Sequence, residues 1–438
     1  MDTETKPDSF LSTFWERNRM LFKGFLIAIL VLMLLIPTVL IQELIRERQG
    51  RQLQATEEVS SKWAAAQTIA GPVIGIPFME SVKDEKGNVE QVKQFAYFLP
   101  ENLQVTGDLL PEERSRGIYK VIVYTSNLKL SGQFGKQDIT SLGINPAAMI
   151  PSEAIIAFPV DDLRGIKEEL RLTLNDSTYE LIPGKVPGDV FGNIVLARIN
   201  IGDMSQSKPF SLSLNLRGSK TLFFMPFGKT TRVSLASKWS DPKFDGNFLP
   251  DHSEVTAGGF RADWNVLYMN RNYPQQWIGT NPDIKSSAFG VELLVPVDAY
   301  LKSERSVKYA ILCIVLTFTA FLMIELIYSK SIHPFQYILV GFALCIFYTL
   351  LISISEYLQF NTAYVISAIA TIALITLYVR SVFQSARISG FIGLTLIFMY
   401  SFIYVLIQSQ DYALLMGSIG LFLTLALVMY FSRKGKLN

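Results

Sequence analysis

The sequence has few of the residues on which most enzyme and metal sites depend. Its 438 residues include two cysteines and two histidines, and only 18% of them are charged. Cys313 and Cys345 both lie in apolar runs, so the long polar middle of the chain has no cysteine and holds no disulfide. That absence is compatible with an oxidising compartment but does not identify one. His252 and His333 are too few for a histidine-rich metal site.

Several sequence patterns with a known chemical mechanism are also missing. There is no Gly-rich phosphate loop, no Gly-x-Ser-x-Gly elbow in the polar middle, and no basic stripe of the kind that nucleic-acid binders carry. No aspartate lies at mid-depth in a predicted membrane segment, which argues against a paired-aspartate intramembrane protease. We therefore predict no enzyme activity, no cofactor and no nucleic-acid partner.

Long apolar runs are what the sequence has instead. Half of the residues are hydrophobic, and a helix needs roughly 20 apolar residues to cross a ~30 Å hydrocarbon core. After a polar tail at 1–20, the run at 21–41 has no small-x-small cleavage site, so we predict an uncleaved anchor instead of a signal peptide. Five more membrane helices are predicted in the block 309–431, at 309–328, 335–355, 362–379, 388–407 and 412–431.

The short loops of this block differ in their content of lysine and arginine. Basic residues lie on one side, whereas the loops at 356–361 and 408–411 carry none; the basic positions are Lys330, Arg380, Arg387 and those of the 432–438 tail. Loops rich in lysine and arginine face the cytoplasm. The sequence therefore predicts that both termini are cytoplasmic and that residues 42–308 lie on the opposite side of the membrane.

Between the first and second membrane helices we predict a stalk helix and a β domain. Residues 42–70 favour a helix, because Glu47–Arg51 and Glu58–Lys62 are i,i+4 pairs in the favourable order, and Gly71-Pro72 ends it. In 210–216 every second residue is apolar, as in a strand with one buried face. The predicted fold class is a multi-pass α-helical membrane protein with six transmembrane helices and a large, mainly-β, antiparallel sandwich-like domain at 71–303.

The strand-like runs are separated by Gly and Pro, and whether they form one or two β subdomains stays open. Short helical insertions are expected near 138–142 and 162–170. The strand-like runs are 73–78, 94–99, 117–124, 128–134, 154–160, 170–174, 179–183, 192–199, 210–217, 221–227, 231–237, 259–265 and 288–295.

The stretch 246–259 is the least regular part of the predicted β domain. It contains Asp251, His252 and Glu254, three residue types that bind metals. The ligand spacing of a zinc or calcium site is missing, however, so we interpret the stretch as a solvated loop with a surface histidine.

Three residues at the ends of predicted membrane helices are candidates for a functional site. An ionisable side chain inside a bilayer is costly, which makes Glu325 and Glu356 candidates. Both lie close enough to an interface to reach headgroup water, so we favour a structural role over an ion or proton path. His333 precedes Pro334 at the start of a helix and is expected to cap that helix or to pair with Glu325.

Motifs along nearly the whole chain resemble those of the CreD family of inner-membrane proteins from Gram-negative bacteria. The matching stretches are GPVIGIP at 71–77, FLPE at 98–101, RGIY at 116–119, WSDPKF at 239–244, GNFLP at 246–250, GFRADW at 259–264, KYAIL at 308–312 and HPFQY at 333–337. The resemblance implies one helix before and five after a large periplasmic domain, so that residues 42–308 are periplasmic. It also implies a role in cell-envelope integrity, with expression under an envelope- or nutrient-responsive two-component system and effects on tolerance to envelope-targeting agents. It supplies no catalytic residues.

Two classes of function are compatible with this sequence. The leading hypothesis is a non-enzymatic protein of envelope integrity whose periplasmic β domain binds an envelope protein, glycan or lipid. The alternative is an ion-coupled transporter or channel that uses Glu325 and Glu356, although no inverted repeat or broken helix is evident. A periplasmic hydrolase is the least favoured hypothesis. The ligand and the oligomeric state stay open, and the lipid bilayer is the one partner predicted from composition alone.

Overall fold

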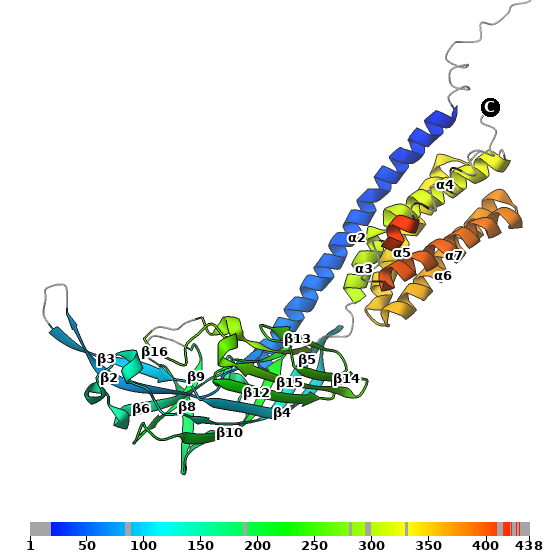
Figure 1. The fold of residues 1–438 in the computed structure, drawn as a ribbon. Coiled ribbons are helices and arrows are strands. Elements are labelled where there is room, and N and C mark those ends of the chain that lie inside the picture. The colour runs from blue at the N-terminus through cyan, green and yellow to red at the C-terminus, as the bar shows by residue number, and fades with distance from the viewer. Residues whose placement is uncertain are drawn as a thin grey trace, which may run out of the picture. The chain divides into compact units, whose positions relative to one another are not determined.

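The computed structural model describes residues 19–83, 89–186, 191–279, 283–293, 299–328, 332–409, 415–420, 422, 426 and 429. It divides into two compact units: a helical unit of Met1–Gln52 and Val297–Asn438, and a β unit of Leu53–Pro296 (Figure 1). Most of the predicted 1–20 tail, the 432–438 tail and most of the predicted membrane helix at 412–431 lie outside the described residues.

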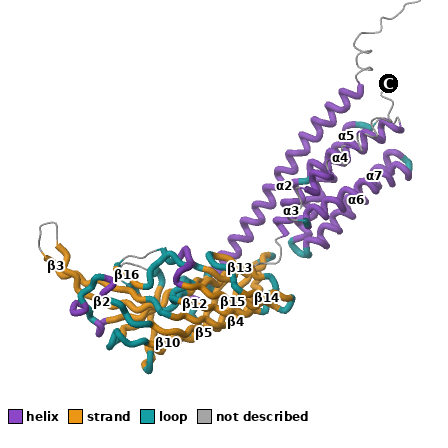
Figure 2. The backbone as a smooth tube through the Cα atoms, in the orientation of Figure 1, coloured by secondary structure: helices purple, strands orange, loops and turns teal. Residues whose placement is uncertain are grey.

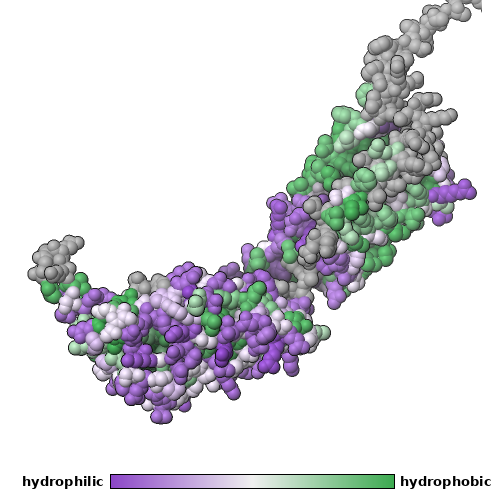
Figure 3. Space-filling view, in the orientation of Figure 1, coloured by the Kyte–Doolittle hydropathy of each residue, from purple (hydrophilic) through white to green (hydrophobic). Residues whose placement is uncertain are grey.

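Helices make up the described part of the helical unit; most are long and apolar, whereas Ala299–Lys308 is a short, polar helix. They are α2 (Arg19–Trp63), α3 (Ala299–Lys308), α4 (Ala310–Tyr328), α5 (Pro334–Ser355), α6 (Phe360–Phe383) and α7 (Ala386–Gln408). Four described helices are long and apolar enough to cross a membrane, and α3 with α4 makes a fifth if that pair, bent by 42°, is one span. Apolar side chains dominate the visible surface of this unit (Figure 3). These helices confirm a multi-pass membrane protein.

Helix α2 packs on its neighbours through one stripe of side chains. The buried positions recur every three or four residues, as expected for one helix face; they are Leu30, Leu34, Thr38, Ile41 and Ile45. Gly341 of α5 lies against this stripe, and a Cβ atom there would lie 2.2 Å from Leu34 Cδ1. The absence of a side chain at Gly341 therefore lets α2 and α5 approach closely.

Helix α2 also runs through the predicted stalk, and its end is earlier than the sequence indicated. The helix ends at Trp63, not at Gly71-Pro72, because Gln67–Ile69 already forms strand β1. The Trp63 indole lies between the guanidinium groups of Arg114 and Arg217, whose Cζ atoms are 4.7 and 4.4 Å from the ring centroid. Such cation–π contacts fix the helix end to the strands of the β unit.

The described residues of the β unit form one 13-stranded and one 4-stranded sheet. Figure 2 shows these strands in orange. The larger sheet has the order β14-β15-β12-β4-β5-β10-β7-β8-β9-β6-β2-β3-β16, and the smaller has the order β1-β11-β17-β13. The strand bounds are β2 Val73–Lys83, β3 Val89–Phe98, β4 Asn102–Arg116, β5 Tyr119–Phe134, β6 Ala154–Pro159, β7 Leu170–Leu174, β8 Ser177–Gly184, β9 Ile194–Ile199, β10 Lys208–Ser219, β11 Thr221–Phe224, β12 Thr230–Ser237, β13 Pro242–Gly246, β14 His252–Thr256, β15 Gly259–Leu267, β16 Gln276–Ile278 and β17 Phe289–Leu293.

Most neighbouring strands are antiparallel, as predicted, but two described pairs are parallel: β1 with β11, and β4 with β12. Buried side chains from both sheets form one hydrophobic core, in which Phe134, Phe158, Phe224, Phe227 and Phe289 are almost fully buried. The large mainly-β region is therefore confirmed. The two short insertions are 3₁₀ turns at Thr140–Leu142 and Leu163–Gly165.

Several strand predictions were wrong for identifiable reasons. Strand β4 was missed although Leu103, Val105 and Leu109 alternate in its first half, because its second half is exposed and rich in charge. The runs at 117–124 and 128–134 are one strand, β5, because the polar residues between them continue the ladder with β10. The stretch 246–259 is not a loop throughout, since β14 forms within it with all five residues exposed.

Candidate functional site

The Glu325 carboxylate forms an ion pair with a residue of the first helix. Its partner is the ammonium group of Lys23, and the Glu325 side chain is only 10% exposed. The two residues are far apart in the sequence, so α2 and α4 are joined here by a long-range electrostatic contact. An ion pair removes much of the cost of burying either charge.

Glu356, at the C-terminal end of α5, has an equivalent arrangement. Its Oε1 atom lies 3.6 Å from the Arg48 guanidinium of α2, and its side chain is also 10% exposed. The same oxygen accepts a hydrogen bond of 3.3 Å from the Tyr300 hydroxyl of α3. Glu356 therefore joins α5 to α2 and α3.

Both candidate carboxylates thus contact the same helix, at two distant levels. Lys23 and Arg48 are roughly 25 residues apart, which corresponds to about 37 Å along an α-helix. That distance is slightly more than the ~30 Å thickness of a hydrocarbon core. The geometry fits two ion pairs at the two edges of the apolar band, with the apolar stripe of α2 between them.

His333 has one of the two roles that the sequence predicted for it, the capping of a helix. Its exposed side chain caps α5, because Nδ1 accepts a hydrogen bond of 3.3 Å from the backbone N–H of Phe335. Capping satisfies a donor that the first turn of a helix leaves without a partner. Of the two predicted roles for His333, capping is the one observed, and the partner of Glu325 is Lys23.

The three residues of the possible metal cluster lie on strand β14 or directly before it. His252 and Glu254 belong to β14, and Asp251 precedes it, with its backbone N–H bonded to Asp263 O at 2.9 Å. In the described part of the chain no group of three or more His, Cys, Asp or Glu residues is arranged to hold a metal ion. His252 and Glu254 lie two positions apart on the same face of β14, whereas Asp251 precedes the strand.

The same strand borders an extended polar surface on one face of the large sheet. Its side chains are aligned by the strand register into three rows, which we call the polar face; all are exposed or half-buried. The first row is His252, Asp263, Ser234, Thr106, Lys129 and Ser213; the second is Asn265, Arg232, Gln104, Ser131, Ser211, Thr173 and Thr178; the third is Glu254, Arg261, Ala236, Asp108, Asn127 and Asn215.

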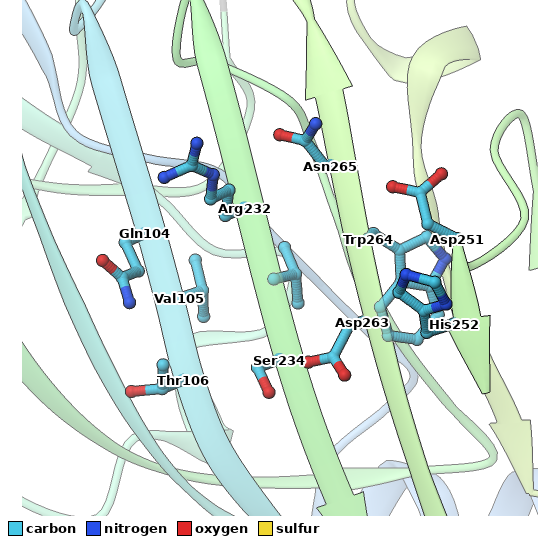
Figure 4. A pocket seen from close by; sticks show the side chains of 11 residues that line it. Gln104, Val105, Thr106, Arg232, Ser234, Asp251, His252, Asp263, Trp264 and Asn265 are labelled. Carbon is cyan, nitrogen blue, oxygen red and sulfur yellow. The ribbon is translucent and has the colours of Figure 1, made fainter. Parts of the chain in front are cut away.

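Two neighbouring hollows lie on the polar face. The first, of about 430 Å³, lies over β4, β12, β15 and the start of β14. Figure 4 shows the side chains of Gln104, Arg232, Ser234 and Asp263 on its strands, and His252 at its border. The second hollow, of about 560 Å³, extends over β5 and β10 and shares Thr106 and Ser234 with the first. The two hollows therefore adjoin each other, and we call the pair the trough.

Sequence reasoning did not find the polar face. Alternation in 210–217 and 231–237 indicated that each strand has a polar side. Which polar side chains become neighbours depends on register, however, and β4 and β12 are parallel partners that lie far apart in the sequence. A pairing between strands so far apart in the chain leaves no pattern in the sequence of either strand.

These features define a class of protein: a multi-helix membrane protein with a large β unit encoded between its first and its later membrane helices. The family model described as "Inner membrane protein CreD" matches residues 19–437. The protein named "Inner membrane protein CreD" from Escherichia coli (strain K12) is 33% identical over 409 residues, which cover 92% of this chain and 90% of that protein. The chain belongs to the CreD family, and its location is the inner membrane.

Proposed function

We propose that this protein supports cell-envelope integrity by binding an envelope component through its polar face, without transforming it. The observation that carries the proposal is the trough on the polar face, which presents hydroxyl, amide and charged groups to solvent over several strands. These groups are spread along the rows and do not converge on one point. Such a distribution suits recognition of an extended surface better than catalysis at one reacting atom.

The proposal includes a topology in which the β unit faces the periplasm. In the sequence, the loops that hold Lys330, Arg380 and Arg387 alternate with loops that have no lysine or arginine, and basic loops face the cytoplasm. Both termini are then cytoplasmic, and residues 42–308 are periplasmic. The polar face is thereby exposed to components of the envelope.

The alternative of ion-coupled transport receives less support. Glu325 and Glu356 each have a cationic partner on α2. An ion pair between two helices holds them together and needs no movement of ions or protons. The two ion pairs support a role in holding α2 to the other helices.

A complementation assay tests the proposed function. A strain lacking the protein is complemented with the native chain, with Ser234→Arg in the middle of the polar face, or with Ser253→Arg. Ser253 is an exposed residue of β14 whose neighbours, His252 and Glu254, belong to the polar face. We expect Ser234→Arg to lose tolerance to envelope-targeting agents and Ser253→Arg to keep it. Full tolerance in both variants, at equal protein levels, contradicts the proposal.

A further inference from the structure

We infer that the ligand of the polar face is an uncharged polysaccharide chain. The inference rests on the proposed function, because it names the chemical class of the envelope component that the face binds. Three properties of the face carry it: its length, the hydrogen-bonding groups that it leaves available, and its balanced charge.

The length of the rows suits a linear polymer. The second row crosses seven strands, from Asn265 on β15 to Thr178 on β8. Neighbouring strands are about 4.8 Å apart, so this row is roughly 29 Å long. A small molecule occupies only one part of such a track, whereas a chain of several sugar rings occupies all of it.

The side chains of the polar face keep most of their hydrogen-bonding capacity for a ligand. Among the described residues of the face, the side chains form few hydrogen bonds: Thr173 with Thr178 at 3.3 Å, and Asn215 with Glu168 at 3.2 Å. Hydroxyl and amide groups both donate and accept hydrogen bonds, as sugar hydroxyl and acetamido groups do. A polyhydroxyl chain is therefore chemically complementary to these rows.

The charge of the face disfavours ligands with a strong charge of one sign. Three cations, Lys129, Arg232 and Arg261, are interspersed with the carboxylates of Asp108, Glu254 and Asp263. Within the described ranges none of these six side chains has an ion-pair partner. A polyanion would be repelled by the carboxylates of the face, and a polycation would be repelled by its cations. Each such contact between like charges lowers the affinity.

An apolar ligand is as poor a match for the polar face as a strongly charged one. Within the three rows Ala236 is the one apolar side chain. A lipid tail or an apolar helix would cover polar groups without forming hydrogen bonds with them, and burying such groups without partners is unfavourable. The observations therefore favour a neutral, hydrogen-bonding chain over a lipid or a peptide.

A binding measurement on the full-length protein in lipid nanodiscs tests this inference. The probes are the hexamer of N-acetylglucosamine and maltohexaose as neutral chains, and dextran sulfate as a polyanion. We expect saturable binding of at least one neutral hexasaccharide, with an affinity that Ser234→Arg lowers roughly tenfold or more. Ser253→Arg is expected to change this affinity by less than about twofold.

The outcomes separate this inference from the proposed function. The inference fails if neither hexasaccharide binds at up to about 10 mM, if dextran sulfate alone binds, or if both arginine variants lower the affinity equally. The proposed function survives those results when Ser234→Arg still abolishes envelope tolerance, because the face then binds a component of another class. Hydrogen exchange of β12 in Ser234→Arg shows whether the sheet is intact, so that a folding defect is recognised.

Discussion

At the scale of single residues, Asp162 shows how one carboxylate organises the start of the β unit. The Arg164 side chain donates hydrogen bonds to it, and together with the backbone N–H of Ala65 and that of Arg164 this holds the Asp162 pKa at about 2, despite the opposing effect of partial burial. The bond from the Ala65 N–H to Oδ2 is 2.9 Å long. Asp162 thereby ties the segment that follows α2 to the 3₁₀ turn at Leu163–Gly165.

We expect Asp162→Asn to weaken this connection in a pH-dependent way. The folded-state pKa is about 2, and the unfolded value is about 3.9, so the charge stabilises the fold above about pH 4 and this contribution is lost as the pH falls to about 2. The variant should cost about 2 kcal/mol at pH 7 and much less at low pH. Hydrogen exchange of residues 64–69, followed at pH 7 and at low pH, measures this loss of stability.

The matched control is Asp161→Asn, which changes the adjacent, exposed carboxylate and leaves Asp162 in place. It should leave exchange of residues 64–69 unchanged. Equal loss of protection in Asp162→Asn at neutral and at acid pH would show that packing, not charge, makes the connection.

Gly132 in β5 leads to a second prediction at this scale. An added Cβ would lie 1.9 Å from the Asn102 carbonyl oxygen of β4 and 2.8 Å from the Phe210 ring. Gly132→Ala should therefore push β4 away from β5 and destabilise the β unit by about 3 kcal/mol. Thermal unfolding followed by the β-sheet circular dichroism signal measures the effect. Gly50→Ala, with nothing within 4 Å, is the control, and an equally stable Gly132→Ala would contradict the observed packing.

At the scale of elements, two ion pairs, Lys23–Glu325 and Arg48–Glu356, hold helix α2 to its neighbouring helices. Lys23→Glu should therefore destabilise the helical unit by about 3 kcal/mol, because it places two carboxylates together. The double variant Lys23→Glu with Glu325→Lys should recover most of that loss. Thermal unfolding in nanodiscs, analysed as a double-mutant cycle, gives the coupling energy.

Additive effects of the two substitutions would show that the side chains do not interact. A parallel set at Arg48 and Glu356, which are 3.6 Å apart, should give a smaller coupling. That contact is longer, and the Arg48 side chain is 35% exposed and therefore better solvated.

The same carboxylates distinguish the two classes of function. We expect Glu325→Gln and Glu356→Gln to retain envelope tolerance in a complementation assay, because under the proposed function their carboxylates only hold α2 to the other helices. Loss of tolerance in both variants at normal protein levels would instead favour the ion-coupled alternative. Expression measured by immunoblot separates this outcome from simple loss of protein.

The sequence was most informative about the positions of individual helices and strands. Apolar length located α4, α5, α6 and α7, and alternation located strands such as β7 and β12 near their observed bounds. Glu325 and Glu356 could be selected because charge is rare in apolar runs. Their partners could not, since Lys23 and Glu325 are more than 300 positions apart and only tertiary packing brings them together. The polar face depends on strand register in the same way.

At the scale of the whole molecule, the proposed topology can be tested with reporters. A reporter that is active only outside the cytoplasm should be active when fused after residue 200 and inactive when fused after Gln384, between α6 and α7. A reporter that is active only in the cytoplasm should give the reverse. Cytoplasmic activity after residue 200 would contradict the periplasmic assignment and with it the proposed access of the polar face to the envelope.

The parallel pairing of β1 with β11 has a consequence for biosynthesis. Gln67 lies opposite Leu222, and β11 in turn needs β17 at Phe289–Leu293 as its other neighbour. At a ribosomal rate of 5–20 residues per second, the segment at β1 waits roughly 10–30 s for its partner strand to be made. During that interval its backbone donors and acceptors are open to wrong pairing. We therefore expect a shortage of chaperones to lower the yield of newly made protein before it affects the assembled protein.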